Sequence, residues 1–286
     1  MKTGARLPQP DGRSDCNRLR VEDAADDRIV VTLDNALSRN AIDETMVAEL
    51  HAVCSVLESE PRILILAGAN GLFASGADIA QLRQRGRDDA LRGINITLFE
   101  RIARLPMPVI AAVEGYALGG GAELAYAADF RLAATSLRIG NPEPALGIVA
   151  GAGATWRLRE LVGEPLAKEI LLAGRVLDAT EAKAAGLVTS IHASDALLPA
   201  AHELADRIGR SDPLAVRLTK AAFHAPRSAH PLVDELAQAI LFESPAKFDR
   251  MQAFLTRRSS TPNPTGERGE RQPTTHTNAV PPKEGP

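Results

Sequence analysis

Two glycine-rich loops are the parts of this sequence best suited to chemistry. The first reads Phe73-Ala74-Ser75-Gly76-Ala77-Asp78-Ile79, and the second runs from Glu114 to Leu124 and contains Gly119-Gly120-Gly121. Each follows a predicted buried strand and opens a predicted helix, whose first backbone N–H groups are free to face an anion. Consecutive glycines also let a ligand approach the backbone closely, because no Cβ atom stands in the way.

Phosphate binding is the first use of such loops to test, and the residues argue against it. The P-loop pattern requires Gly-Lys-Ser/Thr, whereas Gly121 is followed by Ala122-Glu123, whose carboxylate would repel phosphate. The dinucleotide pattern GxGxxG also fails, because Gly151-Ala152-Gly153 leads to Trp156. No GxSxG nucleophile elbow surrounds Ser75. On these residues alone, tight turns in packed junctions and a backbone binding site are both open.

The composition excludes several other classes of function. Cys16 and Cys54 are the only cysteines, so neither a disulfide framework nor a cysteine-based zinc site is expected, and the six histidines lack metal-binding spacing. Aromatic residues make up only 3% of the 286-residue chain, so we expect no surface on which single-stranded nucleic acid stacks. The net charge of -3 argues against a chain that binds nucleic acid over its whole surface. No apolar run is long enough for a membrane span or a signal core. We expect a soluble, cytoplasmic, metal-free α or α/β protein.

Short strands alternate with helices in the part of the chain that must position the loops. Apolar residues at helical spacing predict a helix over residues 44–57, and the second loop opens another over 120–127. Asp178 and Glu181 form a capping-box pattern, with Gly186 ending that helix. Residues 194–258 have the pattern of four consecutive helices. The short apolar or β-rich runs predict strands at 29–33, 63–66, 108–113, 130–134 and 188–191.

The two ends of the chain differ from its middle. Residues 1–27 alternate charges and are interrupted by proline and glycine, so we expect a disordered leader. Residues 259–286 hold six of the 19 prolines and only two hydrophobic residues, which is too little apolar surface for folding. The folded body is then divided into a core, 28–193, and a C-terminal helical subdomain, 194–258.

A third segment, Ile139 to Leu158, gives the two loops a common interpretation. Together the three resemble the enoyl-CoA hydratase/isomerase (crotonase) superfamily. Its typical motifs are AGAD followed by Ile or Leu, G-x-x-x-G-G-G-x-E-L, and PE-x-x-x-G followed by a glycine-rich turn and x-R-L. In this chain they correspond to Ser75–Ile79, Gly115–Leu124 and Pro142–Leu158. The resemblance covers about residues 28–258.

The resemblance implies the fold and the assembly. Members of this superfamily are α/β proteins that build a spiral of ββα repeats, followed by a C-terminal helical subdomain used for oligomerisation. Many assemble as trimers or as dimers of trimers. We therefore expect this architecture here, and a homotrimer or a hexamer.

The resemblance also implies the site. Its common chemistry stabilises the enolate of an acyl-CoA thioester with two backbone N–H groups, which by motif position are those of Ala77 and Gly120. The same motifs place Ala77, Asp78, Ile79, Gly120 and Gly151 against the substrate. No cofactor is implied, because CoA enters as part of the substrate. The first loop is followed by Ala80-Gln81, where many members carry Lys or Glu, so the contacts of the CoA phosphates stay unassigned.

Glu123 and Glu143 match the two glutamates of the hydratases in this superfamily. Hydration of a trans-2-enoyl thioester requires a water activated toward the β-carbon and a proton for the α-carbon. Two carboxylates with separated pKa values can share this work. We therefore expect an enoyl-CoA hydratase of fatty acid metabolism. An isomerase, which mainly needs Glu143, is the alternative, together with other acyl-CoA enzymes of this fold and a non-catalytic acyl-CoA-binding protein.

Overall fold

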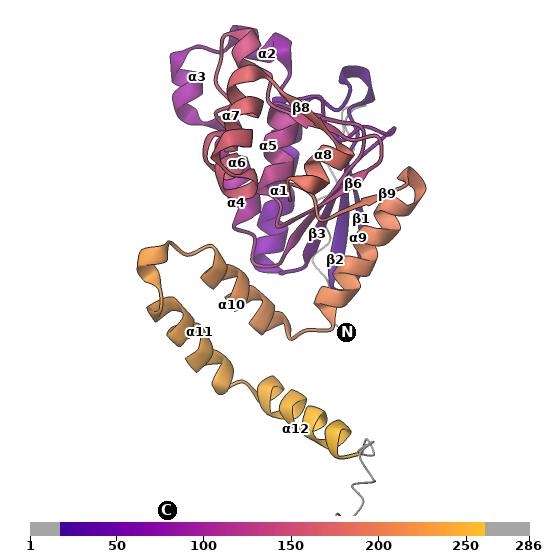
Figure 1. Ribbon diagram of the computed structural model, residues 1–286, viewed down its shortest axis with the longest axis vertical. Helices are drawn as coiled ribbons and strands as arrows, with labels where there is room; N and C mark the ends of the chain where they lie inside the picture. The colour runs from indigo at the N-terminus through magenta and orange to yellow at the C-terminus, as the bar shows by residue number, and fades with distance from the viewer. Residues whose placement is uncertain (1–17, 261–286) are drawn as a thin grey trace, which may run out of the picture. The chain divides into compact units, whose positions relative to one another are not determined.

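Two β-sheets form the centre of the computed structural model, which describes residues 18–260 (Figure 1). The larger sheet has the strand order β1-β2-β3-β4-β6-β9, in which β1 is antiparallel to β2 and the other neighbours are parallel. The smaller sheet has the order β5-β7-β8. The strands are β1 Leu19–Ala25, β2 Arg28–Leu33, β3 Ile63–Gly68, β4 Val109–Val113, β5 Tyr116–Leu118, β6 Phe130–Ala134, β7 Arg138–Gly140, β8 Val176–Asp178 and β9 Ser190–His192.

Helices connect the parallel strands and continue beyond the last one. The predicted helices over 44–57 and 120–127 are confirmed, as is the capping box at Asp178 and Glu181. The α-helices are α1 Glu44–Ser59, α2 Ile79–Gln84, α3 Arg87–Arg92, α4 Ile94–Ala103, α5 Gly120–Ala127, α6 Ala154–Val162, α7 Glu164–Ala173, α8 Ala179–Ala184, α9 Ser194–Gly209, α10 Pro213–Phe223, α11 Leu232–Phe242 and α12 Pro245–Ser260. Three short 3₁₀ helices are η1 Ala36–Ser38, η2 Glu143–Leu146 and η3 Arg227–Ala229. The expected α/β architecture with C-terminal helices is confirmed.

The strands of the larger sheet alternate their side chains between two apolar layers, as the two-residue period of a strand requires. Leu64 and Leu66 of β3 belong to the layer that contains α1, α4 and α5. Ile63 and Ile65 belong to the opposite layer, which contains Ala201 of α9. Both faces of the sheet are therefore covered, as is usual for parallel strands.

Helix α9 corrects the expected domain boundary at residue 193. Its buried residues Leu197, Ala201 and Ala205 pack on the larger sheet, and Figure 1 shows the helix running along the strands. Helix α9 is therefore part of the core rather than the first helix of a separate subdomain. The chain instead divides between Leu241 and Phe242, and the second unit contains α12.

Strand β1 corrects the expected length of the leader. Leu19–Ala25 pairs with β2 in antiparallel register, from Leu19 opposite Leu33 to Ala25 opposite Arg28, with an irregularity in the middle. The folded body therefore begins before residue 28. Residues 1–17 and 261–286, on which most of the leader and tail predictions fall, lie outside the described residues. No helix within 18–260 combines the length and the apolar character needed to cross a membrane.

Candidate active site

The first glycine-rich loop is held against β5 by backbone hydrogen bonds. Phe73 N–H donates to the Glu114 carbonyl at 2.8 Å, Ala74 N–H donates to Tyr116 at 3.0 Å, and Leu118 N–H donates to Ala74 at 3.2 Å. On its other side, the loop forms a parallel bridge with Ile42. Because these contacts leave the loop little freedom, they fix Ala77 beside the start of α5.

Two glycines are required for this close approach. A Cβ atom on Gly121 would lie 2.4 Å from the carbonyl oxygen of Ala74, which no side chain tolerates. Gly76 has a φ of 116°, and a Cβ atom there would lie 3.0 Å from the carbonyl oxygen of Leu118. The sequence pattern of glycines therefore reflects contact between the two loops rather than only local turns.

The backbones of Ala77 and Gly120 lie close together. A Cβ atom on Gly120 would lie 3.4 Å from the backbone nitrogen of Ala77. Neither N–H donates to an acceptor within residues 18–260. Gly120 is the first residue of α5, where the helix leaves its N–H groups unpaired and its dipole favours negative charge. The pair can therefore receive an oxyanion, as the resemblance implies.

Glu123 lies one turn further along α5 and is buried, with 3% of its surface exposed. Its Oε1 atom accepts hydrogen bonds from the backbone N–H groups of Ala152, at 2.7 Å, and Ala154, at 3.1 Å. Burial raises the pKa of Glu123 to about 7, and the nearby Glu143 carboxylate adds to the rise, while the two N–H groups oppose it. Near neutral pH this group can therefore both take and give a proton.

Glu143 begins the 3₁₀ helix η2 and is also buried. Its Oε1 atom accepts a long hydrogen bond of 3.4 Å from Asn141 Nδ2, whereas its buried Oε2 atom has no hydrogen-bond partner within residues 18–260. Burial raises the pKa of this carboxyl too. A Cβ atom on Gly119 would lie 3.0 Å from Glu143 Oε1, so the carboxylate reaches the residue directly before Gly120.

Tyr126 and Asn141 form a hydrogen-bond chain that leads to Glu143. Neither residue was predicted from the sequence. Both side chains are buried, and the Tyr126 hydroxyl donates to Asn141 Oδ1 at 3.1 Å. Asn141 Nδ2 in turn donates, at 3.4 Å each, to the Gly119 carbonyl and to Glu143. A usable signal was present, because Tyr126 lies three residues after Glu123 on the same helix and therefore on the same face.

Three other predicted site residues border these groups. The Asp78 carboxylate caps α2 by accepting from Gln81 N–H at 2.8 Å, so its side chain has a local structural role. Ile79 is 59% exposed as the first residue of α2. Gly151 is exposed in the loop directly before Ala152, which binds Glu123. The structure brings together Ala77, Gly120, Glu123 and Glu143. Asp78, Ile79 and Gly151 lie at the edge of that group.

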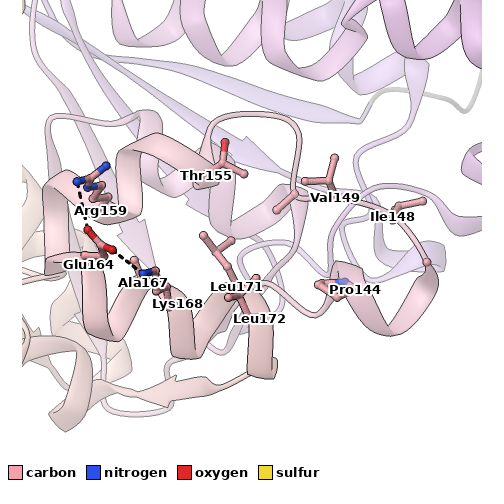
Figure 2. A pocket seen from close by; sticks show the side chains of 12 residues that line it. Pro144, Ile148, Val149, Thr155, Arg159, Glu164, Ala167, Lys168, Leu171 and Leu172 are labelled. Carbon is pink, nitrogen blue, oxygen red and sulfur yellow. Dashed lines mark hydrogen bonds and ion pairs between the residues drawn. The ribbon is translucent and has the colours of Figure 1, made fainter.

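A cavity of about 590 Å³ lies next to this site and does not include it. Figure 2 shows Pro144, Ile148 and Val149, which follow Glu143, facing Leu171 and Leu172 of α7 across it. None of the two amides and two carboxylates lines this hollow. The four candidate groups are therefore identified by their contacts with one another, and the cavity is a neighbouring, mainly apolar surface feature. The described part of the chain contains no cluster of three or more His, Cys, Asp or Glu residues able to hold a metal ion.

Comparisons with known proteins give matches over most of the chain. The model of the enoyl-CoA hydratase/isomerase family matches residues 26–261. A short-chain-enoyl-CoA hydratase of Clostridium acetobutylicum is 35% identical over 245 residues, covering 80% of this chain and 91% of that protein. An enoyl-CoA isomerase/hydratase of Mycosarcoma maydis is 34% identical, covering 78% and 86%. The crystal structure of an enoyl-CoA hydratase from Bacillus anthracis superposes with a TM-score of 0.79 at 32% identity, covering 88% of this chain and all of that one.

Proposed function

Because the chain belongs to the enoyl-CoA hydratase/isomerase family, we propose that it adds water to a trans-2-enoyl-CoA to give a 3-hydroxyacyl-CoA. The observation that carries this proposal is the presence of two buried carboxyl groups, Glu123 and Glu143, beside the two unpaired N–H groups. An acyl-CoA in fatty acid metabolism is the corresponding substrate class. CoA is part of that substrate, and no separate cofactor takes part.

In this proposal, the N–H groups of Ala77 and Gly120 hold the thioester oxygen. As water adds to the β-carbon, the π electrons of the enoyl group move onto that oxygen, and the two donors stabilise the developing charge. Backbone donors suit this role because they are fixed before the reaction begins. Loss of one such donor typically costs about 2.7–4 kcal/mol of barrier.

The two carboxyl groups handle the protons. One carboxylate accepts a proton from water while the oxygen bonds to the β-carbon, and the other carboxyl delivers a proton to the α-carbon of the enolate. This division needs one ionised and one protonated group, and two acids that repel each other in a buried site favour that state. The raised pKa of Glu123, about 7, supports it, because the carboxyl then keeps its proton through part of the neutral range.

An isomerase is the second candidate, and one observation favours it. The buried Oε2 atom of Glu143 has no partner within the described part of the chain, so a single base is free to move a proton between two carbons. The name of the Mycosarcoma maydis relative joins both activities. Glu123 argues for hydration, because a double-bond shift mainly needs the carboxylate at position 143.

A panel of acyl-CoA thioesters, analysed by mass spectrometry, tests these alternatives on the full chain. We expect short and longer trans-2-enoyl-CoAs to gain the mass of one water molecule, with loss of the conjugated-thioester absorbance. Glu143→Gln should reduce this turnover by at least about a hundredfold. The matched control is Glu164→Gln, because Glu164 is exposed and pairs with Lys168 on the surface. Tight acyl-CoA binding without turnover would instead indicate a binding protein.

We further propose a homotrimer or a dimer of trimers. Large apolar side chains are exposed on the C-terminal helices, where a second copy could cover them. On α11 they are Leu232, Leu236 and Ile240, and on α12 they are Phe248, Met251, Phe254 and Leu255. Light scattering coupled to gel filtration measures the assembly directly. A monomer at micromolar concentration would contradict this proposal.

A further inference from the structure

Asn95 lies beside the two unpaired N–H groups, and its side-chain oxygen is buried without a hydrogen-bond partner in the described part of the chain. A Cβ atom on Gly120 would lie 3.6 Å from Asn95 Nδ2 and 3.4 Å from the Ala77 nitrogen, so the carboxamide borders the same space. Its Oδ1 atom is buried and lacks a partner within residues 18–260. A buried acceptor that is left unsatisfied destabilises the fold, so the absence of a partner among these residues needs a reason.

The position of Asn95 is rigid. It lies in the first turn of α4, whose residues Leu98, Phe99 and Ile102 are buried in the core. Glu100 of the same helix forms an ion pair of 2.5 Å with Arg157 of α6. The backbone of Asn95 is therefore held in place by its helix, which keeps the carboxamide close to the two N–H groups.

The neighbours of Asn95 along α4 are apolar. Ile94 and Ile96 are half-buried and pack against the main hydrophobic core. An apolar residue at position 95 would avoid the cost of an unpaired amide next to the N–H groups of Ala77 and Gly120. A polar residue at position 95 is therefore consistent with a bound ligand that supplies the missing hydrogen bond to Asn95 Oδ1.

We propose that Asn95 is a specificity-determining residue that binds a hydroxyl group on the acyl chain of the substrate. The inference deepens the proposed function and rests on it. The unpaired buried atom is an acceptor, so its partner must donate, and a hydroxyl is a neutral hydrogen-bond donor. A ketone or a carboxylate has no proton to donate and leaves Oδ1 unsatisfied. The carboxamide borders the two N–H groups, so the test places the hydroxyl close to the thioester, on the fourth or on the fifth acyl carbon.

Two substrates that differ only in this hydroxyl test the assignment. We compare kcat/KM for but-2-enoyl-CoA and 4-hydroxybut-2-enoyl-CoA, with 5-hydroxypent-2-enoyl-CoA and pent-2-enoyl-CoA as the longer pair. In the wild-type protein, at least one hydroxylated substrate should be preferred over its partner. Asn95→Leu, similar in size but unable to hydrogen-bond, should shift that preference by at least about tenfold toward the unsubstituted chain. Thr97→Ala, at an exposed position of the same helix, should leave the preference unchanged.

The results separate this inference from the proposed function. If the wild type hydrates but-2-enoyl-CoA and Asn95→Leu slows both substrates equally, Asn95 acts on the thioester or on water, and the inference is overturned. An unchanged ratio in Asn95→Leu also overturns it.

If no thioester is hydrated, the proposed function fails, and calorimetry with saturated butyryl-CoA and 4-hydroxybutyryl-CoA still tests Asn95. There, a hydroxyl preference in the wild type that is lost in Asn95→Leu supports the assignment, and equal affinities refute it. Asn95→Ala replaces Asn95→Leu in both assays if the leucine variant does not fold.

Discussion

Replacing Glu123 by glutamine should inactivate the protein and also make it more stable above neutral pH. Glutamine keeps the oxygen that accepts from the Ala152 and Ala154 N–H groups, so the local structure has no reason to change. It removes a carboxyl whose ionised form is disfavoured by burial and by the charge of Glu143. Glu123→Gln should therefore lower the rate of hydration while it raises the free energy of unfolding.

The pKa of Glu123 sets the size of the effect. A rise from 4.5 to about 7 corresponds to roughly 3 kcal/mol, because one pH unit is worth about 1.4 kcal/mol. Between these two values the folded protein binds more protons than the unfolded chain, so the free energy of unfolding falls as pH rises. The penalty is nearly absent below pH 4.5 and is complete above pH 7. Between pH 5 and 8.5 the advantage of Glu123→Gln should grow by roughly 2–3 kcal/mol.

Urea denaturation of the wild type and Glu123→Gln at several pH values measures this difference directly. We expect a small advantage in midpoint for Glu123→Gln at pH 5 and a much larger one at pH 8.5, with hydration reduced at least about a hundredfold throughout. Glu164→Gln controls for loss of one surface carboxylate and should show no such growth. An advantage that is absent, or that does not change with pH, would refute the conclusion that Glu123 is destabilised when ionised.

Three further variants test other parts of the structure. Gly121→Ala should push the first loop away from α5 and lower kcat by about 100- to 1000-fold, as expected for a displaced oxyanion donor, whereas Gly86→Ala, which meets no atom within 4 Å, should leave kcat unchanged. Tyr126→Phe leaves Asn141 without its donor, so the unfolding free energy should fall by about 1–2 kcal/mol and kcat should fall more than KM rises; an unchanged kcat would contradict a positioning role. Lys220→Met leaves Asp129, 2.7 Å away, as a poorly compensated buried charge, and urea denaturation should show a loss of about 3 kcal/mol; a loss below about 1 kcal/mol would show that the pair is not needed.

The sequence predicted the elements with strong local patterns. The helix over 44–57 has apolar residues at every turn, and the structure extends it only to Ser59. The strands over 63–66 and 130–134 are short apolar runs that the larger sheet buries on both faces. These features depend on neighbouring residues, which is why the order of residues alone reveals them.

Features that depend on distant contacts were missed or misplaced. Strand β1 is rich in charged residues and becomes a strand only by pairing with β2, so its sequence resembles a leader. Helix α9 has the pattern of any amphipathic helix, and only the sheet it covers assigns it to the core. The hydrogen bond from Tyr126 to Asn141, and the absence of a partner for Asn95 Oδ1 among residues 18–260, follow from the packing of helices and loops far apart in the chain.

The origin of the product's new oxygen tests the central claim most directly. But-2-enoyl-CoA is incubated with the full chain in water enriched in oxygen-18, and the product is fragmented in a mass spectrometer. The proposed hydration predicts a 3-hydroxyacyl-CoA with one solvent oxygen on the third carbon, and none of this product from a protein carrying Glu123→Gln and Glu143→Gln together. A shifted double bond without solvent oxygen, or free CoA with a labelled acid, would contradict it.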